Sequence, residues 1–263
     1  MKNIAILGCG WLGMPLAAEM SKNGYSLSGS TTTKEKLPKI ESIGVSPFLI
    51  ELGETELIGD IHGFLANANI LIINVPPKRK TESEFTLKLK ALIPFIEKSN
   101  IAKVLFVSST SVYGDNNNVV SEDSVLKPET QSGKDLMKSE VLLQQNKNFQ
   151  TTILRFGGLI GGDRNPIKFL SGKPLENPNG PVNLIHQDDC IGIINAIISE
   201  NSWDEIFTGV TPFHPTRQEY YLAKAKEQAL PPPIPQDGPT KGKIVTSEKL
   251  QSVLKYQFVH PKF

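Results

Sequence analysis

The chain of 263 residues contains only two cysteines, Cys9 and Cys190. Because they lie far apart in the sequence, they predict neither a disulfide framework nor a metal site built from cysteines. No apolar run reaches the roughly eighteen residues that a membrane helix requires, and the N-terminal apolar run is too short for a signal peptide. We therefore expect a soluble protein of a reducing compartment, most simply the cytoplasm, with no membrane partner.

An excess of charge of one sign is also missing, since 28 basic residues face 27 acidic ones and the formal net charge is +1. Binding to nucleic acid or to anionic lipid needs a concentrated basic face, and no block of like charge is present. We expect no nucleic-acid partner and a small-molecule substrate instead. The chain length and the hydrophobic content of 39% are enough for one large core, or for one core with a small appended lobe.

Short apolar runs alternate with helix-spaced patterns over the first 155 residues. The spacing predicts helices over 11–22, 82–98 and 132–146. Strands are predicted over 4–7, 26–29, 45–50, 70–73, 103–107 and 151–155. Near-continuous apolar strands separated by helices favour a parallel sheet covered on both faces, and right-handed crossovers then give a doubly wound α/β fold. Ligands of such folds bind at the carboxyl ends of the strands.

The residue composition changes after about residue 156, where frequent glycines and prolines divide the chain into short segments. Helices are predicted over 187–199 and 216–227, and the proline-rich run 231–235 is typical of a stiff connector. We predict an N-terminal domain over 1–160. A small C-terminal lobe over 161–263 is expected to be partly integrated with the N-terminal core.

The first predicted strand is followed by the sequence Gly8-Cys9-Gly10-Trp11-Leu12-Gly13. Three glycines at this spacing permit a tight turn, approach of the backbone to a pyrophosphate, and close contact between helix and strand. The helix that follows would point its free N–H groups at the phosphates. The loop therefore predicts an NAD(P)-binding Rossmann fold. The residues expected to contact the dinucleotide are Gly8, Gly10, Trp11, Leu12 and Gly13. The alternative is an ordinary strand–turn–helix with incidental glycines.

The residues after the second strand bear on which dinucleotide is bound. An acidic side chain there would bond the ribose hydroxyls and favour NAD, but no acid occurs before Glu35. Hydroxyls and a lysine suit a 2′-phosphate, so we predict NADP, with NAD as the alternative, and with contacts from Thr31, Thr33 and Lys34. A polar helix cap at Thr33 is the competing interpretation. Further cofactor contacts are expected at later strand ends, from Asn74, Val75, Pro76 and Ser108.

Four segments together resemble a known family. The segments 107–114 (VSSTSVYG), 154–161 (LRFGGLIG) and 183–189 (NLIHQDD) resemble elements of extended short-chain dehydrogenases/reductases, the NAD-dependent epimerase/dehydratase family. The glycine loop resembles that of an atypical, YeeZ-like branch. The resemblance covers nearly the whole chain and implies the same fold, with a C-terminal lobe that binds substrate.

The resemblance also implies a mechanism, from which this sequence departs. In the family, a tyrosine is the general acid/base, a lysine four residues later lowers its pKa, and a serine or threonine donates to the same substrate oxygen. Ser109 takes the serine/threonine place, whereas the tyrosine and lysine places hold Ser132 and Leu136. Tyr113, which in the family more often lines the substrate pocket, is the nearest phenol that could replace the missing tyrosine. The catalytic candidates are Ser109, Tyr113 and Ser132.

Three residues of the later segments are candidates for contact with the substrate. Arg155 ends a strand at the ligand edge, where it would anchor an anion or pair with an acid of the lobe. Arg164 lies in a glycine-rich loop where the family binds substrate. His186 precedes Asp188 and Asp189, a pattern that would suit a His–Asp relay or an ordinary helix start with acids in its first turn. We expect no metal site, because no second cluster of ligands is apparent in the sequence.

These observations leave three hypotheses open. The first is an NADP-dependent oxidoreductase or epimerase-like enzyme, a monomer or homodimer, acting on a hydroxyl or carbonyl of a small polar substrate such as a nucleotide sugar. The second is a non-catalytic NADP-binding redox sensor or regulatory protein, motivated by the missing tyrosine–lysine pair. The third is reduction of an imine or a double bond, where the substrate supplies its own proton acceptor.

Overall fold

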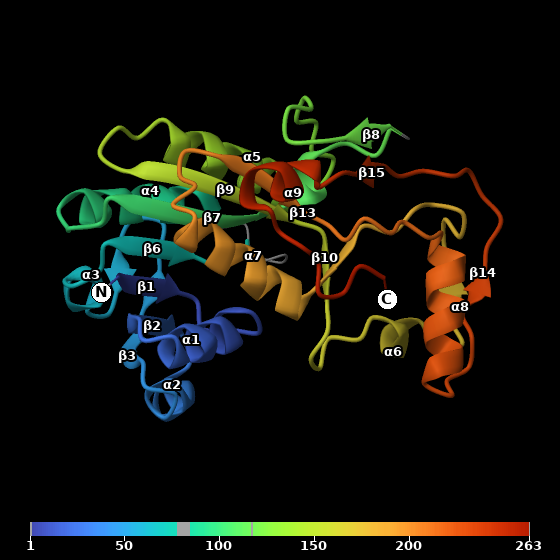
Figure 1. Cartoon of the computed structure of the whole chain (residues 1–263). Helices are drawn as coiled ribbons and strands as arrows, with labels where there is room; N and C mark the ends of the chain where they lie inside the picture. Colours follow the sequence, from blue (N-terminus) through green and yellow to red (C-terminus); the bar gives the residue numbers. More distant parts are fainter. Residues whose placement is uncertain (1, 78–84, 117, 263) are drawn as a thin grey trace. The chain divides into compact units, whose positions relative to one another are not determined.

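Residues 2–77, 85–116 and 118–262 are described by a computed structural model, shown in Figure 1 with the colours following the sequence. Within these ranges no helix is both long enough and apolar enough to cross a membrane. The chain divides into two compact units, each assembled from several segments, and each is described on its own below.

The first unit is built on a seven-stranded sheet (Figure 1) with the strand order β13-β9-β7-β6-β1-β2-β3, of which the last residue of β9 and the last three residues of β13 are assigned to the second unit. The neighbours β3–β2, β2–β1, β1–β6 and β6–β7 are parallel. The strands are β1 (Asn3–Leu7), β2 (Ser26–Thr31), β3 (Ser46–Leu49), β6 (Ile70–Ile73), β7 (Lys103–Ser109), β9 (Gln150–Phe156) and β13 (Ile206–Gly209). The prediction of a doubly wound parallel sheet is confirmed, and six of these strands were predicted, whereas β13 was not.

Burial explains why these runs form a sheet covered on both faces. All four residues of β6 are buried, and so are Ile4 to Leu7 of β1. A strand whose successive side chains are all buried must be covered on both faces, because successive side chains point to opposite sides. The strand order reverses direction at β1, since the chain moves from β1 to β2 and β3 and then returns to β6 on the other side.

The helices of the first unit follow from this reversal. Right-handed crossovers in opposite directions place their helices on opposite faces of the sheet. The helices are α1 (Gly13–Lys22), the short 3-10 helix η1 (Lys34–Lys36), α2 (Leu37–Glu41), α3 (Ile61–Leu65), α4 (Phe85–Glu97) and α5 (Gln131–Gln144). A small antiparallel pair, β4 (Glu51–Leu52) with β5 (Leu57–Ile58), follows β3. Helix α1 begins two residues later than predicted. Of the helix predicted over 82–98, residues 82–84 lie outside the described residues.

The division of the chain differs from a single boundary at residue 160. The first unit consists of 1–109, 130–155 and 197–206, and the second of 110–129, 156–196 and 207–263. The chain thus leaves the first unit after β7, returns for α5 and β9, and returns again for a third segment. A change in residue composition along the chain does not reveal this interleaving, because the segments that return to the first unit form ordinary helices and strands.

The second unit is built from pairs of short parallel strands that join distant parts of the sequence. These pairs are β10 (Gly158–Ile160) with β12 (Leu184–His186), β11 (Pro174–Leu175) with β14 (Ile234–Pro235), and β8 (Val119–Val120) with β15 (Ile244–Val245). The helices are η2 (Thr110–Val112), α6 (Ile167–Leu170), α7 (Gln187–Ser199, whose last three residues belong to the first unit), α8 (Arg217–Glu227) and α9 (Glu248–Leu254). The two predicted helices, 187–199 and 216–227, are confirmed as α7 and α8.

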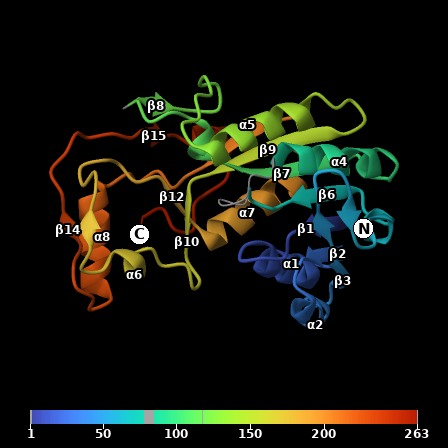
Figure 2. The ribbon, with the colours of Figure 1, turned by 180° about the vertical axis from the view of Figure 1, so that it is seen from behind.

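The proline-rich run 231–235 is more than the connector that we predicted. Its last two residues form β14, which lies beside α8 in both views (Figure 2). The Ile234 N–H donates to the Lys173 carbonyl at 2.9 Å, and the Ser171 hydroxyl donates to the Pro231 carbonyl at 3.0 Å. The run is held because a neighbouring segment supplies hydrogen bonds that the sequence alone does not reveal.

Candidate dinucleotide site

The loop between β1 and α1 requires glycine at two positions, for its backbone conformation at the first and for space at both. Gly8 has a φ of +105°, in the region that L side chains rarely occupy, and a Cβ atom there would lie 2.6 Å from the Asn74 carbonyl oxygen. A Cβ atom at Gly13 would lie 2.2 Å from the Gly8 carbonyl oxygen. The first and third glycines therefore allow the tight turn and the close contact of helix and strand that the sequence predicted.

Side chains from two neighbouring strands hold this loop in place. The Gly8 N–H donates to the Ser30 hydroxyl at 3.0 Å, and the Asn74 side-chain amide donates to the Gly8 carbonyl at 3.0 Å. The Cys9 N–H also donates to the Ser30 carbonyl at 2.7 Å. Asn74 was predicted as a cofactor contact, and the structure adds that it fixes the loop. Ser30 was missed, because a serine inside a strand carries no sequence signal for this role.

Gly10 differs from its two neighbours in the motif. A Cβ atom at Gly10 would meet no other atom within 4 Å, so this glycine has open space in front of it. No side chain therefore covers the backbone of Gly10 just before α1. The N–H groups and the dipole at the start of a helix favour binding of an anion. No acidic residue occurs in the first turn of α1. The arrangement suits a pyrophosphate, which needs close approach to the backbone and no competing carboxylate.

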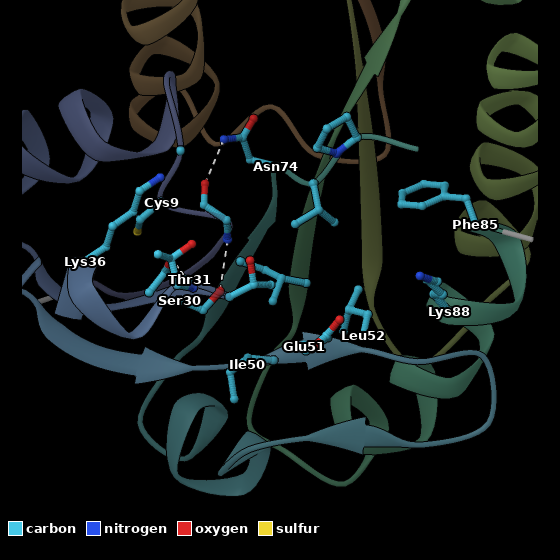
Figure 3. Close-up of a pocket in the computed structure, with 17 residues that line it drawn as sticks. Cys9, Ser30, Thr31, Lys36, Ile50, Glu51, Leu52, Asn74, Phe85 and Lys88 are labelled. Atoms are coloured by element: carbon cyan, nitrogen blue, oxygen red, sulfur yellow. Dashed lines mark hydrogen bonds between the residues drawn. The ribbon is translucent and has the colours of Figure 1, made fainter. Parts of the chain in front are cut away.

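A cavity of about 270 Å³ lies beside the loop, at the carboxyl ends of β1, β2, β3 and β6 (Figure 3). The lining residues are Leu7, Gly8, Cys9, Gly10, Ser30, Thr31, Thr32, Thr33, Lys36, Ile50, Glu51, Leu52, Asn74, Val75, Pro76, Phe85 and Lys88. This edge is where open α/β sheets bind ligands, at the point where the strand order reverses. The volume is just below the roughly 300–1,000 Å³ of a typical small-molecule site, which fits one part of a dinucleotide.

Seven of the predicted cofactor residues line this cavity: Gly8, Gly10, Thr31, Thr33, Asn74, Val75 and Pro76. The others do not line it, namely Trp11, Leu12, Gly13, Lys34 and Ser108. Leu12 is buried in the core and Gly13 supports the turn. The sequence analysis missed two further charged lining residues, Glu51 and Lys88, because Glu51 follows the third strand and Lys88 lies on α4, whereas the motif marks only the ends of the first two strands.

The segment after β2 presents hydroxyl groups and one lysine to the cavity. Thr31 is buried, and its hydroxyl accepts a hydrogen bond from the Thr33 N–H at 3.1 Å, which fixes the turn into η1. Lys36, two residues beyond the predicted Lys34, lines the cavity, and Figure 3 shows it near Thr31 and opposite Phe85 and Lys88. The predicted type of contact is thus available, but the cation comes from the last residue of η1 and not the first.

Cys9 lies within the loop without being a reactive thiol. Burial raises its pKa to about 12, although a hydrogen bond with the backbone of Ser30 acts in the opposite direction. Since the thiolate is the nucleophilic form, a thiol with so high a pKa is inert near neutral pH. Cys9 is therefore a small residue that fits the turn.

A buried ion pair joins α5 to the sheet within the first unit. The Arg155 guanidinium binds both oxygens of Glu140, the shortest contact being 2.7 Å from Nη2 to Oε2, and the Ser108 hydroxyl donates to Glu140 Oε1 at 2.5 Å. All three residues are buried. Of the two roles considered for Arg155, pairing with an acid is realised, but the acid lies on α5 and not in the lobe. The hydroxyl of Ser108 is directed to Glu140, so a cofactor contact from Ser108 would come from its backbone.

The catalytic candidates lie on different elements. Ser109 is the last residue of β7, and Ser132 lies in the first turn of α5, after the cap that Thr130 makes with the Gly133 N–H at 3.1 Å. Leu136, at the family's lysine position, is buried. Tyr113 follows η2 in the second unit and is only 2% exposed. The burial of Tyr113 favours packing as its role over that of a proton donor.

The second unit brings a distant histidine to the predicted substrate residue His186. Asp188 Oδ2 lies 3.3 Å from His186 Nδ1 and 2.9 Å from His260 Nε2, and the two imidazole rings are 3.7 Å apart. Burial lowers the pKa of His186, and the nearby His260 lowers it further, while Asp188 opposes both effects. Sequence reasoning missed His260, because it stands alone near the end of the chain. Arg164 lies beside Gly161, with which its backbone forms a short bridge.

Comparisons with known proteins agree with this reading of the first unit. Residues 3–124 match the family model described as the NAD binding domain of 6-phosphogluconate dehydrogenase. Protein YeeZ of Escherichia coli (strain K12) is 33% identical over 267 residues, covering 99% of this chain and 97% of that protein. A chloroplastic protein of Arabidopsis thaliana, the epimerase family protein SDR39U1 homolog, is 22% identical, covering 77% of this chain and 64% of its own length.

The fold is shared with solved structures of much lower sequence identity. The UDP-glucuronic acid 4-epimerase of Bacillus cereus, solved in complex with NAD, superimposes with a TM-score of 0.81 at 17% identity. The alignment covers 100% of this chain and 92% of that one. The two chains therefore share the same fold over nearly their whole lengths.

Proposed function

The chain belongs to the YeeZ-like branch of atypical extended short-chain dehydrogenases/reductases, the NAD-dependent epimerase/dehydratase family, and on this premise we propose an enzyme. It binds a nicotinamide dinucleotide on the first unit and acts on a hydroxyl or carbonyl of a small polar substrate. A nucleotide sugar is the substrate class we favour, because a relative in fold is an epimerase of such a compound. The bound nicotinamide would supply or accept hydride.

One observation carries the proposal, namely the open face of Gly10 between two glycines that are sterically required. Gly8 and Gly13 close the turn, and Ser30 and Asn74 hold it, so the N–H groups at the start of α1 are arranged before any ligand arrives. A preorganised site loses less conformational entropy on binding than a flexible one. A loop that served only to join β1 and α1 would not need a bare backbone at its centre.

We propose NADP as the preferred form of the cofactor. Thr32, Thr33 and Lys36 line the cavity at the end of β2 and would bind the 2′-phosphate, with Thr31 shaping the turn. Glu51 also lines the cavity, at the end of the following strand, and it would suit the hydroxyls of an unphosphorylated ribose. The preference for NADP therefore requires that Lys36 attract the 2′-phosphate more strongly than Glu51 repels it.

Ser109 is the residue we propose as hydrogen-bond donor to the reacting oxygen, because it ends β7 at the ligand edge of the sheet. Ser132 stands at the tyrosine position of the family. Its hydroxyl has no cationic neighbour one turn further on, where Leu136 is buried. We propose Arg164 and His186 as substrate contacts from the second unit, with Tyr113 lining the site rather than transferring the proton.

A second function remains in view, because a specific observation favours it. Leu136 replaces the lysine that would lower the pKa of the acid/base, and its apolar side chain is buried. Such a helix can still support cofactor binding, but it offers little help to proton transfer. A dinucleotide-binding redox sensor or regulatory protein without turnover would have this arrangement.

The binding proposal is tested with a matched pair of glycine variants. Gly10→Ala adds a methyl group where the protein itself leaves space, so we expect a normally folded protein with NADPH affinity reduced at least about tenfold, measured by fluorescence titration. Gly238→Ala is the control, because a Cβ atom there also meets nothing within 4 Å and the residue belongs to the second unit. Unchanged NADPH affinity of Gly10→Ala would overturn the placement of the cofactor.

Turnover distinguishes the enzyme from the sensor. NADPH oxidation is measured across a panel of carbonyl compounds, imines and nucleotide sugars, with nucleotide-sugar epimerisation followed separately by NMR. The enzyme hypothesis predicts turnover with at least one class, and a lower kcat in Ser109→Ala than in the wild type. Tight cofactor binding without turnover on any class would favour the sensor.

A further inference from the structure

The second unit contains three potential metal ligands that lie far from the glycine loop in sequence and have no part in dinucleotide binding. His186 ends β12, Asp188 lies in the first turn of α7, and His260 belongs to the C-terminal segment. One ligand atom from each of the three lies within 4.8 Å of the other two. We propose that His186, Asp188 and His260 bind a first-row divalent metal ion of the Zn²⁺ type.

The distances are close to those of a tetrahedral zinc site. A zinc ion lies about 2.0–2.2 Å from its nitrogen and oxygen ligands, which places two tetrahedral ligand atoms about 3.4 Å apart. Asp188 Oδ2 is 3.3 Å from His186 Nδ1 and 2.9 Å from His260 Nε2. An ion would therefore require the Asp188 carboxylate oxygen to shift by less than an ångström relative to each imidazole nitrogen.

The kinds of ligand decide between classes of metal. Two imidazole nitrogens and one carboxylate oxygen suit Zn²⁺ and its first-row neighbours, whereas Mg²⁺ and Ca²⁺ prefer an all-oxygen shell. Three protein ligands leave at least one coordination position for water or for a substrate atom. The ligands are also accessible, since the side chain of Asp188 is 56% exposed and that of His260 is 36% exposed.

A second, buried carboxylate holds the C-terminal ligand in position. Asp189 is fully buried, and its side chain accepts hydrogen bonds from the Val259 N–H at 2.7 Å, the His260 N–H at 3.1 Å and the Tyr256 hydroxyl at 2.9 Å. The C-terminal segment is thus fastened to the start of α7, one residue from Asp188. Support of this kind is what keeps a ligand in place before the ion arrives.

Two glycines allow this arrangement. A Cβ atom at Gly161 would lie 2.3 Å from His186 Nε2, and one at Gly192 would lie 2.5 Å from the Tyr256 hydroxyl oxygen. Gly161 leaves room for the imidazole of His186, and Gly192 leaves room for the Tyr256 ring of the C-terminal segment. Close packing within the unit therefore sets where His186 and the C-terminal segment lie.

The test uses metal-free, tag-free full-length protein and ZnCl₂ as the probe in isothermal titration calorimetry. We expect one Zn²⁺ per chain, little response to MgCl₂, and a rise in the unfolding temperature with Zn²⁺ concentration, because an ion that binds only the folded state stabilises it. His260→Ala should lower Zn²⁺ affinity at least about 100-fold, since even the loss of a supporting residue costs about 10–100-fold.

Matched variants separate this site from adventitious binding. His62→Ala removes an exposed histidine of the first unit, and Asp237→Asn neutralises an exposed acid of the second, so both should bind Zn²⁺ like the wild type. Asp188→Asn should lose affinity as His260→Ala does. Circular dichroism confirms that each variant is folded. Equal Zn²⁺ affinity in His260→Ala and the wild type, or no saturable binding in the wild type, would overturn the proposal, and neither result depends on the cofactor.

Discussion

At the scale of single residues, the least expected feature is the buried pair of Glu140 and Arg155. The two charges compensate each other and share Ser108 as a further partner. A buried ion pair contributes little compared with a well-packed apolar pair, but removal of one partner leaves an uncompensated charge in the interior. The pair fixes the position of α5, which carries Ser132 and Leu136 on the same face as Glu140.

Glu140→Gln should destabilise the protein by about 3–5 kcal/mol, because the Arg155 guanidinium then stays buried without its counter-charge. Chemical denaturation measures the change. Glu54→Gln, an exposed acid in the loop between β4 and β5, is the control and should change the free energy of unfolding very little. A loss of less than about 1 kcal/mol in Glu140→Gln, as for a surface pair, would contradict this view of the pair.

The role of a residue could be predicted from the sequence where a backbone motif determines it. It could not be predicted where the role depends on a partner that is distant in the sequence. Gly8, Gly10 and Gly13 follow from the motif alone. Glu140 could not be assigned to Arg155 from the sequence, since the choice of partner depends on α5 packing over β7 and β9. His260 was missed for the same reason, because its place beside His186 depends on contacts with distant residues, such as the hydrogen bonds of the C-terminal segment to Asp189.

At the scale of elements, the short helix η1 determines which cation reaches the cavity. Lys34 and Lys36 are its first and last residues, and side chains two positions apart on a helix do not share a face. Lys36 lines the cavity whereas Lys34 does not. The sequence predicted a lysine after β2 but placed it two residues early, because a three-residue helix leaves no periodic pattern from which to read its register.

Lys36→Ala should therefore weaken NADPH binding by about tenfold while leaving NADH binding almost unchanged, since one charge near a 2′-phosphate contributes about 1–2 kcal/mol. Both affinities are measured by fluorescence titration. Lys34→Ala removes the same charge from the same helix and is the matched control. Equal losses for NADPH and NADH in Lys36→Ala would contradict the preference for NADP, and a larger effect of Lys34→Ala would restore the original assignment.

Strands and longer helices were predicted well, because their residues are buried in runs or at helical spacing. β13 was missed since Ile206–Gly209 is a short run beside polar residues, and its role as a strand is decided by pairing with β9. β14 contains a proline and lies in a run that appears extended and unpaired from sequence. Elements that depend on a distant neighbour are the ones a local pattern cannot supply.

At the scale of the whole molecule, the interleaved segments decide what can fold independently. Residues 197–206 complete the first unit, where the Thr151 N–H donates to Asp204 Oδ1 at 3.0 Å and the Thr152 hydroxyl donates to the Ser202 carbonyl at 3.1 Å. Residues 110–129 belong in turn to the second unit. The boundary at residue 160, predicted from a change of composition, therefore divides each unit, because each has segments on both sides of it.

A fragment of residues 1–160 should accordingly lack a cooperative unfolding transition, whereas the full chain shows one. Thermal unfolding followed by circular dichroism provides the comparison. Mixing the fragment with a second fragment of residues 161–263 should restore part of the transition, because the missing segments of each unit are then present. A sharp transition in the fragment 1–160 by itself would show that the N-terminal domain is autonomous.

The pairing of β13 with β9 also has a consequence for synthesis on the ribosome. Strand β9 has seven residues and emerges about fifty residues before its four-residue outer neighbour, so until β13 has left the exit tunnel the longer strand forms the edge of the nascent sheet, with its outer N–H and C=O groups unpaired. An open strand edge is a template for association with other chains, and chains are made at about 5–20 residues per second. Each nascent molecule is therefore exposed to self-association for several seconds, an interval that chaperones acting on ribosome-bound chains are suited to cover.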